Sequence, residues 1–160
     1  MSDYTKEIDR QLKKIGEQCV SEIRDALADT GTNASGRTSA SLHVVAGDGV
    51  VEVWGRPAFG TVEHGRRAGR VPRNFRAIIA RWIIDKGIPV QPVDVKRVTD
   101  RDGHTRALLR MAGAIAWKIR TEGSRLHREG GRSDIYTPAV QRAKDAVEQY
   151  FANVATTILE

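Results

Sequence analysis

The sequence has a single cysteine, few aromatic residues and no long apolar run. Because Cys19 is the only cysteine among 160 residues, an intramolecular disulfide framework is excluded. Aromatic residues make up only 6% of the chain, so we expect a core of Val, Ile, Leu and Ala. No apolar run approaches the roughly 18 residues that a membrane-spanning helix needs. The charged N-terminus lacks the apolar segment of a signal peptide, so we expect a protein that is cytosolic when made.

The sequence motifs of common catalytic sites are also missing. The four histidines are too scattered for the close spacing of metal ligands; they are His43, His64, His104 and His127. There is no Gly-x-Ser-x-Gly nucleophile motif, and "GRRAGR" lacks the lysine and the hydroxyl residue of a phosphate-binding loop. Glu63 and His64 form the only acid/base pair beside a glycine loop, although adjacent side chains point in different directions. We therefore expect no catalytic, cofactor-binding or metal-binding residues and no enzyme. A nuclease or transferase using this pair stays a weaker alternative.

The charge of the chain is unevenly distributed. Apolar residues make up 40% and charged residues 29%, which is typical of a soluble globular protein, and the length favours one domain. The net charge is +6, yet residues 1–30 carry −2, residues 56–76 carry +5 and residues 96–110 carry +3. A negatively charged partner would therefore meet the middle of the chain.

Hydrophobic periodicity predicts an α+β fold with a small antiparallel sheet packed against three or four helices. Apolar residues at steps of three and four predict a helix over residues 4–28. Alternating valines on both sides of "AGDG" predict a β-hairpin over residues 41–55. Further helices are predicted over about 74–86, 105–122 and 138–158, and a flexible loop over about 88–104. Expected boundary residues are the N-caps Asn74, Thr105 and Thr137, and Gly87 as the helix stop.

The predicted helix over residues 74–86 carries an apolar stripe. We expect one buried face made of Phe75, Ile78, Ile79, Trp82 and Ile83.

The loop over residues 65–73 is rich in arginine. Arg66, Arg67, Arg70 and Arg73 are expected to project from it, and Arg76 follows just after it. Guanidinium groups bind phosphate oxygens, which suggests contact with DNA, but they also pair with carboxylates of a neighbouring subunit. No base-reading motif accompanies them, so both interpretations stay open.

The order of these segments resembles the head–tail joining, or tail-completion (neck), proteins of long-tailed bacteriophages and prophages. The resemblance runs from about residue 25 to the end and covers three motifs. The first is Ser35-Gly36-Arg37, a strand entry in the family. The second is Val62-Glu63-His64-Gly65, preceded here by Ala58-Phe59-Gly60 where the family has Tyr-Ala. The third is a helix with Ile79, Trp82, Ile83, Lys86, Gly87 and Ile88.

The resemblance implies a structural virion protein. Such a protein would form a ring in the head–tail connector, with portal or adaptor proteins and tail proteins as partners. Non-specific contact with phage DNA is a further expectation, and there is no membrane partner or cofactor. The family motifs would be structural, and the arginine loop would face the assembly or DNA. The protein would occupy the host cytoplasm during assembly and then the virion. The alternative is a free-standing DNA-binding module that uses the same loop.

Overall fold

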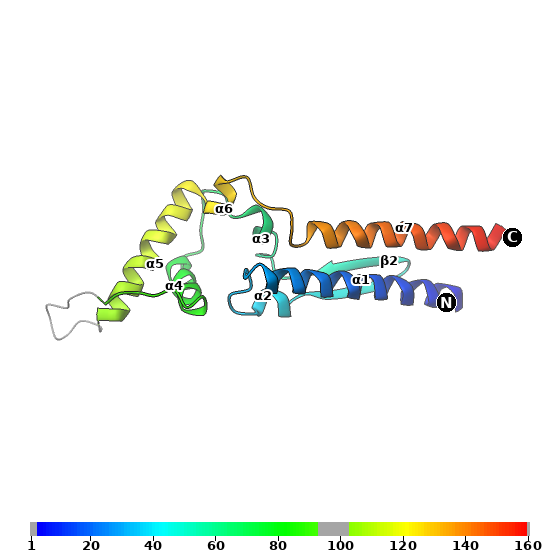
Figure 1. The fold of residues 1–160 in the computed structure, drawn as a ribbon, viewed down its shortest axis with the longest axis horizontal. Coiled ribbons are helices and arrows are strands. Elements are labelled where there is room, and N and C mark those ends of the chain that lie inside the picture. Colours follow the sequence, from blue (N-terminus) through cyan, green and yellow to red (C-terminus); the bar gives the residue numbers. More distant parts are fainter. Residues whose placement is uncertain (1–2, 93–102, 160) are drawn as a thin grey trace. The chain divides into compact units, whose positions relative to one another are not determined.

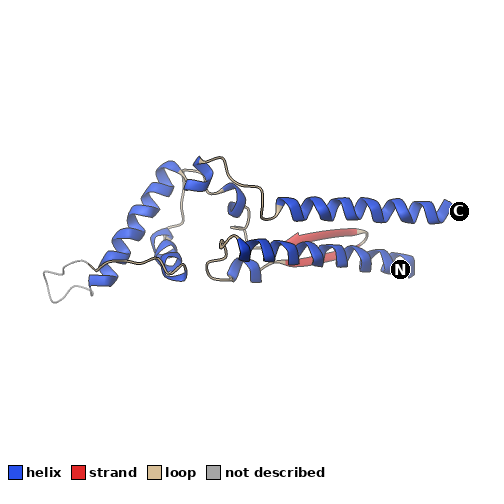
Figure 2. Cartoon of the chain, viewed as in Figure 1, coloured by secondary structure: helices blue, strands red, loops and turns tan. Residues whose placement is uncertain are grey.

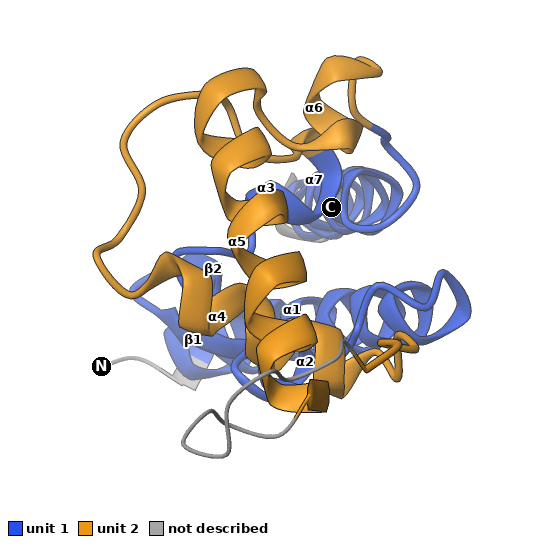
Figure 3. Ribbon diagram, turned by 90° about the vertical axis from the view of Figure 1, so that its left-hand side faces the viewer, with its two compact units in different colours: residues 1–63, 132–160 blue, residues 64–131 orange. Residues whose placement is uncertain are grey.

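The computed structural model describes residues 3–92 and 103–159 and confirms the α+β class (Figure 1). Seven helices and one two-stranded antiparallel sheet lie in these residues (Figure 2). The chain divides into two compact units, coloured separately in Figure 3. Unit 1 comprises residues 1–63 and 132–160, and unit 2 comprises residues 64–131. Most of the predicted loop over 88–104 lies outside the described residues.

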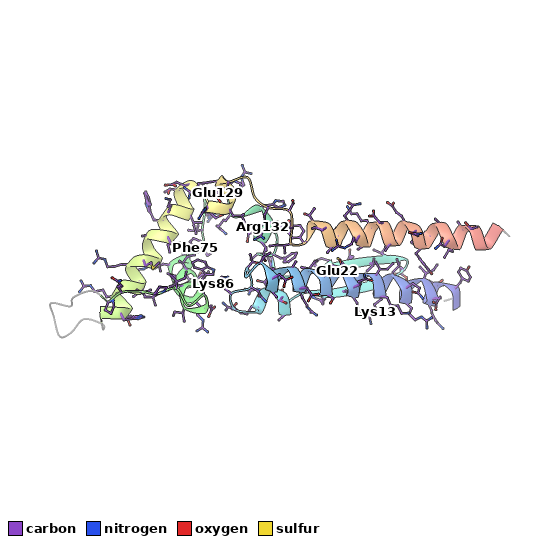
Figure 4. The ribbon with its side chains drawn as sticks, in the orientation of Figure 1. Lys13, Glu22, Phe75, Lys86, Glu129 and Arg132 are labelled. Atoms are coloured by element: carbon purple, nitrogen blue, oxygen red, sulfur yellow. The ribbon has the colours of Figure 1, made fainter. Side chains whose placement is uncertain are left out.

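Unit 1 is built on the long helix α1 (Asp3–Asp29), which was predicted from its apolar spacing and buries Leu12, Cys19, Ile23 and Leu27. The hairpin of β1 (His43–Gly47) and β2 (Val50–Trp54) packs against this helix at Gly16. A Cβ atom at Gly16 would lie 2.7 Å from Val44 and 2.8 Å from Val51, so the close approach of the sheet requires glycine. Helix α7 (Thr137–Leu159) packs beside α1. Arg142 of α7 donates a 2.8 Å hydrogen bond to Glu22, the residue labelled on α1 in Figure 4.

The hairpin turn agrees with its sequence signal. Gly47 pairs with Val50, which leaves Asp48 and Gly49 as a two-residue loop with φ of 53° and 76°. Two positive φ values are those of a type I′ turn, for which Asp-Gly is a preferred sequence. The Asp9 carboxylate accepts a 2.9 Å hydrogen bond from the Gly49 amide and fastens the turn to α1.

Unit 2 is formed mainly by α4 (Phe75–Asp85) and α5 (Gly103–Glu122), followed by the short α6 (Arg125–Arg128). Its core contains Phe75, Ile79, Ala80, Ile83 and Ala112. The prediction that Ile78 and Trp82 share the buried face is wrong, because they are 45% and 40% exposed. The apolar residues of α4 cover more than half of its circumference, and α5 packs against the side that includes Ala80.

Several predicted helix ends are also corrected. Helix α5 begins at Gly103, so Thr105 lies inside it and is no cap. Asn74 precedes α4, but its side chain makes no capping hydrogen bond. Thr137 was predicted as an N-cap but is the first residue of α7, and its hydroxyl donates a hydrogen bond to the Glu63 carboxylate. Ser35-Gly36-Arg37 enters the short helix α2 (Arg37–Ala40) and not a strand.

The predicted end of α4 at Gly87 is confirmed. Gly87 has φ 62°, and its amide donates to the Ile84 carbonyl at 2.9 Å. The next amide, of Ile88, donates to the Ile83 carbonyl at 3.0 Å, which completes a Schellman motif. Ile88 then packs against the core of unit 2.

Candidate functional site

The arginine loop is fastened to the end of α5 at two points. Ser124 accepts a 2.8 Å hydrogen bond from the Arg66 amide through its hydroxyl, and its own amide donates to the Arg66 carbonyl at 2.8 Å. Further along, the Gly69 amide donates to the Arg120 carbonyl at 2.8 Å. Gly65 has φ 68°, and a Cβ there would lie 2.4 Å from the His127 amide nitrogen. The loop is therefore held on α5, in contrast to the free projection that the sequence suggested.

Arg66 does not project from the loop. Its side chain is half-buried, one terminal nitrogen donates to the Arg70 carbonyl at 2.8 Å, and its guanidinium lies 5.3 Å from the ring centre of Phe75. The Nε atom is buried and has no hydrogen-bond partner among the described residues. Arg66 therefore holds the loop against α4, and the expected partner-facing role does not fit its side chain.

The other loop arginines are exposed, and two of them line a hollow. This arginine hollow, of about 440 Å³, is bordered by Arg70 and Arg73 from the loop, Arg76 from α4, and Arg120 and Trp117 from α5. Its remaining border includes the small residues Gly113 and Ala116. Arg67 is exposed but lies outside the lining.

Trp117 and Arg120 were missed by sequence reasoning, whereas Arg76 was expected beside the loop. The signal was the spacing of Gly113, Ala116, Trp117 and Arg120, which stand at i, i+3, i+4 and i+7 and so share one face of a helix. The small residues had suggested close approach of another element. Ala112 does pack in the core, whereas Gly113 lies beside the Arg76 side chain. A Cβ at Gly113 would be 3.5 Å from the Arg76 Nε atom, which itself donates to the Leu109 carbonyl.

Glu63 is the one fully buried charged residue among the described side chains, at 0% exposed. It lies in α3 (Thr61–His64), and one carboxylate oxygen accepts hydrogen bonds from the amides of Ile135, Tyr136 and Thr137 at 2.7, 2.7 and 3.0 Å. The other oxygen accepts from the Thr137 hydroxyl at 2.5 Å. Glu63 thus caps the N-terminus of α7 from a point 74 residues earlier in the chain.

The environment of Glu63 favours the ionised carboxylate. Burial by itself raises the pKa of a carboxyl group, but the hydrogen bonds from Thr137, Ile135 and Tyr136 outweigh burial and lower the pKa of Glu63 below its ordinary value. All four hydrogen bonds stay within unit 1, and through them the carboxylate holds the start of α7 in place. Its sequence neighbour His64 is exposed, and the His64 carbonyl lies 3.2 Å from Nδ1 of His127.

The structure also places other residues that carry the sequence resemblance. Val62 packs against the core of unit 1. Gly36 has φ 71° and precedes α2, and the Ser35 hydroxyl accepts a 2.9 Å hydrogen bond from Arg37. Lys86 is the C-cap of α4.

Within residues 3–92 and 103–159, no cluster of three or more His, Cys, Asp or Glu side chains is placed to hold a metal ion. No helix in the same residues has the length and apolar character needed to cross a membrane. Comparison with protein-family models, with curated proteins and with solved structures finds no match to this chain. The geometry described above and the sequence motifs are therefore the basis for a functional proposal.

Proposed function

We propose that the protein is a structural component of the head–tail connector ring of a tailed bacteriophage, joining the portal to the tail. The observation that carries this proposal is the opposite charge of the two compact units. Unit 1 contains ten Lys and Arg against fourteen Asp and Glu, a net charge of −4. Unit 2 contains sixteen against six, a net charge of +10. A ring needs a heterologous interface, in which one surface of each subunit meets a different surface of the next, and opposite charges favour such pairing.

Both units also expose apolar surface. In unit 1 an apolar groove of about 560 Å³ lies between α1, β2 and α7, and its lining includes Leu12, Ile15, Val51, Val53, Val140 and Val147. In unit 2 the exposed large apolar side chains among the described residues are Ile78, Trp82, Ile84 and Trp117. Monomeric proteins seldom leave large apolar patches uncovered, so these surfaces support a role in association.

The position of Glu63 also supports a structural role. Glu63 and His64 were the candidate acid/base pair of an enzyme. In the structure the Glu63 carboxylate caps α7, whereas His64 is exposed. The family motif Val62-Glu63 then serves to join distant segments of unit 1. In this proposal the partners are further copies of the chain, portal or adaptor proteins and tail proteins. The chain acts in the host cytoplasm during assembly and afterwards in the virion.

Charge reversal with complementation tests the proposal. Glu17→Lys with Asp25→Lys changes the exposed face of α1, and Arg67→Glu with Arg70→Glu changes the loop of unit 2. We expect the wild-type chain to form closed oligomers by native mass spectrometry, and either double variant alone to lose them. An equimolar mixture should restore them, because the reversed α1 of one variant meets the reversed loop of the other. A wild-type chain that stays monomeric at high concentration and with its virion neighbours would overturn the proposal.

The free-standing DNA-binding module is the competing proposal, and the exposed arginines favour it. The mass of the purified protein with and without duplex DNA separates the two. A monomer that binds duplex with a steep salt dependence fits the module, because phosphate contacts release counterions. An oligomer that forms without DNA fits the connector.

A further inference from the structure

The arginine hollow combines positive charge with an exposed aromatic ring. Trp117 is 64% exposed, the largest exposure among the exposed large hydrophobic residues of the described chain. It borders the hollow together with Arg70, Arg73 and Arg120. A tryptophan so exposed contributes little to the core of its own unit, so its ring is available to a ligand.

No described carboxylate of unit 2 neutralises the positive charge of the hollow. The described carboxylates of this unit are Asp85, Glu122 and Glu129. Asp85 pairs with Arg81 and Glu129 with Arg125, and Glu122 pairs with Lys118 and Arg128. None of these carboxylates borders the hollow. Among the described side chains, the guanidinium groups of Arg70, Arg73 and Arg120 form no ion pair.

We propose that the arginine hollow binds a short single-stranded segment of nucleic acid. Arg70, Arg73 and Arg120 would contact its phosphates, and one unpaired base would stack on Trp117. Proteins that bind single strands combine these two elements, a positively charged groove and an aromatic platform. The volume of about 440 Å³ falls within the range of ligand pockets, roughly 300–1,000 Å³.

The tryptophan distinguishes a single strand from the other anions that arginines bind. An acidic peptide would pair with the guanidinium groups but has no flat ring to stack, and in a duplex the bases are already stacked on each other. Apart from its arginines, the described lining has only apolar side chains and glycine, with no amide, hydroxyl or carboxylate side chain to read base edges, which predicts little sequence preference. This site goes beyond the proposed connector role and holds whether or not the chain forms a ring.

Fluorescence titration of the full-length chain tests this proposal. The ligands are a labelled 12-nucleotide oligothymidine, the corresponding duplex and polyglutamate of similar charge. We expect the single strand to bind more tightly than the other two and to quench tryptophan emission. Trp117→Ala should weaken binding about 5- to 150-fold, the usual effect of losing one stacked base. Trp117→Phe should retain most of the affinity while the quenching is lost.

A pair of arginine variants separates a defined site from diffuse charge. Arg73→Ser with Arg120→Ser should reduce the slope of log K against log salt concentration by about 1.4, because two phosphate contacts of a single strand are removed. The matched control is Arg125→Ser with Arg128→Ser, which removes the same charge from exposed residues outside the hollow. Equal losses in both double variants, equal or tighter binding of duplex or polyglutamate, or unchanged binding in Trp117→Ala would each overturn the proposal. The oligomeric state of the same samples reports separately on the connector role.

Discussion

Removing the Glu63 carboxylate should strongly destabilise unit 1. In Glu63→Ala the amides of Ile135, Tyr136 and Thr137 and the Thr137 hydroxyl lose their acceptor. A hydrogen bond to a charged group contributes about 1.5–3 kcal/mol, and a buried donor left unsatisfied costs about 1–3 kcal/mol. Because water can enter the space and satisfy part of this set, we expect a loss of about 3–5 kcal/mol of unfolding free energy. For a chain of this length that corresponds to a fall in Tm of roughly 6–20 °C.

Glu63→Gln separates the charge from the shape of the side chain. The amide oxygen can still accept from the three backbone amides, and the Thr137 hydroxyl can turn to accept from the new NH₂ group. We therefore expect a smaller loss, about 1–2 kcal/mol, which reflects the weaker neutral acceptor. The assay is urea denaturation at pH 7, followed by far-ultraviolet circular dichroism. Glu17→Gln, at an exposed position of α1, is the control for removing a carboxylate.

The contribution of Glu63 should also depend on pH with a defined sign. The pKa of Glu63 is lowered on folding, so the carboxylate stabilises the protein above its unfolded pKa of about 4.5. This stabilisation is lost as the pH falls through the lower pKa of the folded state. The difference between wild type and Glu63→Gln should therefore narrow below about pH 4.5. A Glu63→Ala variant within 1 kcal/mol of wild type, or a difference independent of pH, would refute the capping role of this carboxylate.

Two further predictions concern unit 2. Ile83→Ala should cost about 2–5 kcal/mol of unfolding free energy, whereas Ile84→Ala should cost less than about 1 kcal/mol, because Ile83 is 1% and Ile84 57% exposed. Similar urea midpoints for the two variants would show that the buried face of α4 is wrongly assigned. Gly65→Ala should cost more than about 2 kcal/mol of unfolding free energy, since φ is 68° and the new Cβ would lie 2.4 Å from the His127 amide nitrogen. The control is Gly60→Ala, whose new Cβ would meet no atom within 4 Å. Equal urea midpoints for the two alanine variants would contradict this account.

The parts of the fold that were predictable are those governed by local sequence. The stripe of α1 indicates its buried face, because a helix packed on one side needs apolar residues at steps of three and four. The Asp48-Gly49 turn and the Gly87 stop follow from the positive φ values that these residues tolerate. Local preferences of this kind are carried by a few neighbouring residues, so the sequence alone shows them.

The parts that were not predictable depend on contacts between distant segments. Helix α4 is apolar on most sides, so only its packing on α5 shows that Ile78 and Trp82 are exposed. Arg66 turns inward because Phe75 and Arg70 receive its guanidinium, a contact that no loop sequence indicates.

The candidate site likewise joins segments that are far apart in the sequence. Trp117 and Arg120 lie beside the loop because the Gly69 amide donates to the Arg120 carbonyl and Ser124 holds Arg66. Arginine content alone could therefore suggest an anionic ligand but could not identify the aromatic ring beside it.

The link between Glu63 and α7 sets an order of events during synthesis of the chain. The 68 residues of unit 2 are synthesised after Glu63 and before the residues that it binds. Until α7 is made, the apolar side that α1 and the hairpin share is therefore uncovered. Closing a loop of this length costs only slightly more than closing one of half the length, since the entropy grows with the logarithm of the loop size. The delay is therefore kinetic, and at about 5–20 residues per second it lasts for several seconds. In that interval we expect the uncovered apolar side of α1 and the hairpin to attract chaperones and other nascent copies of the same chain.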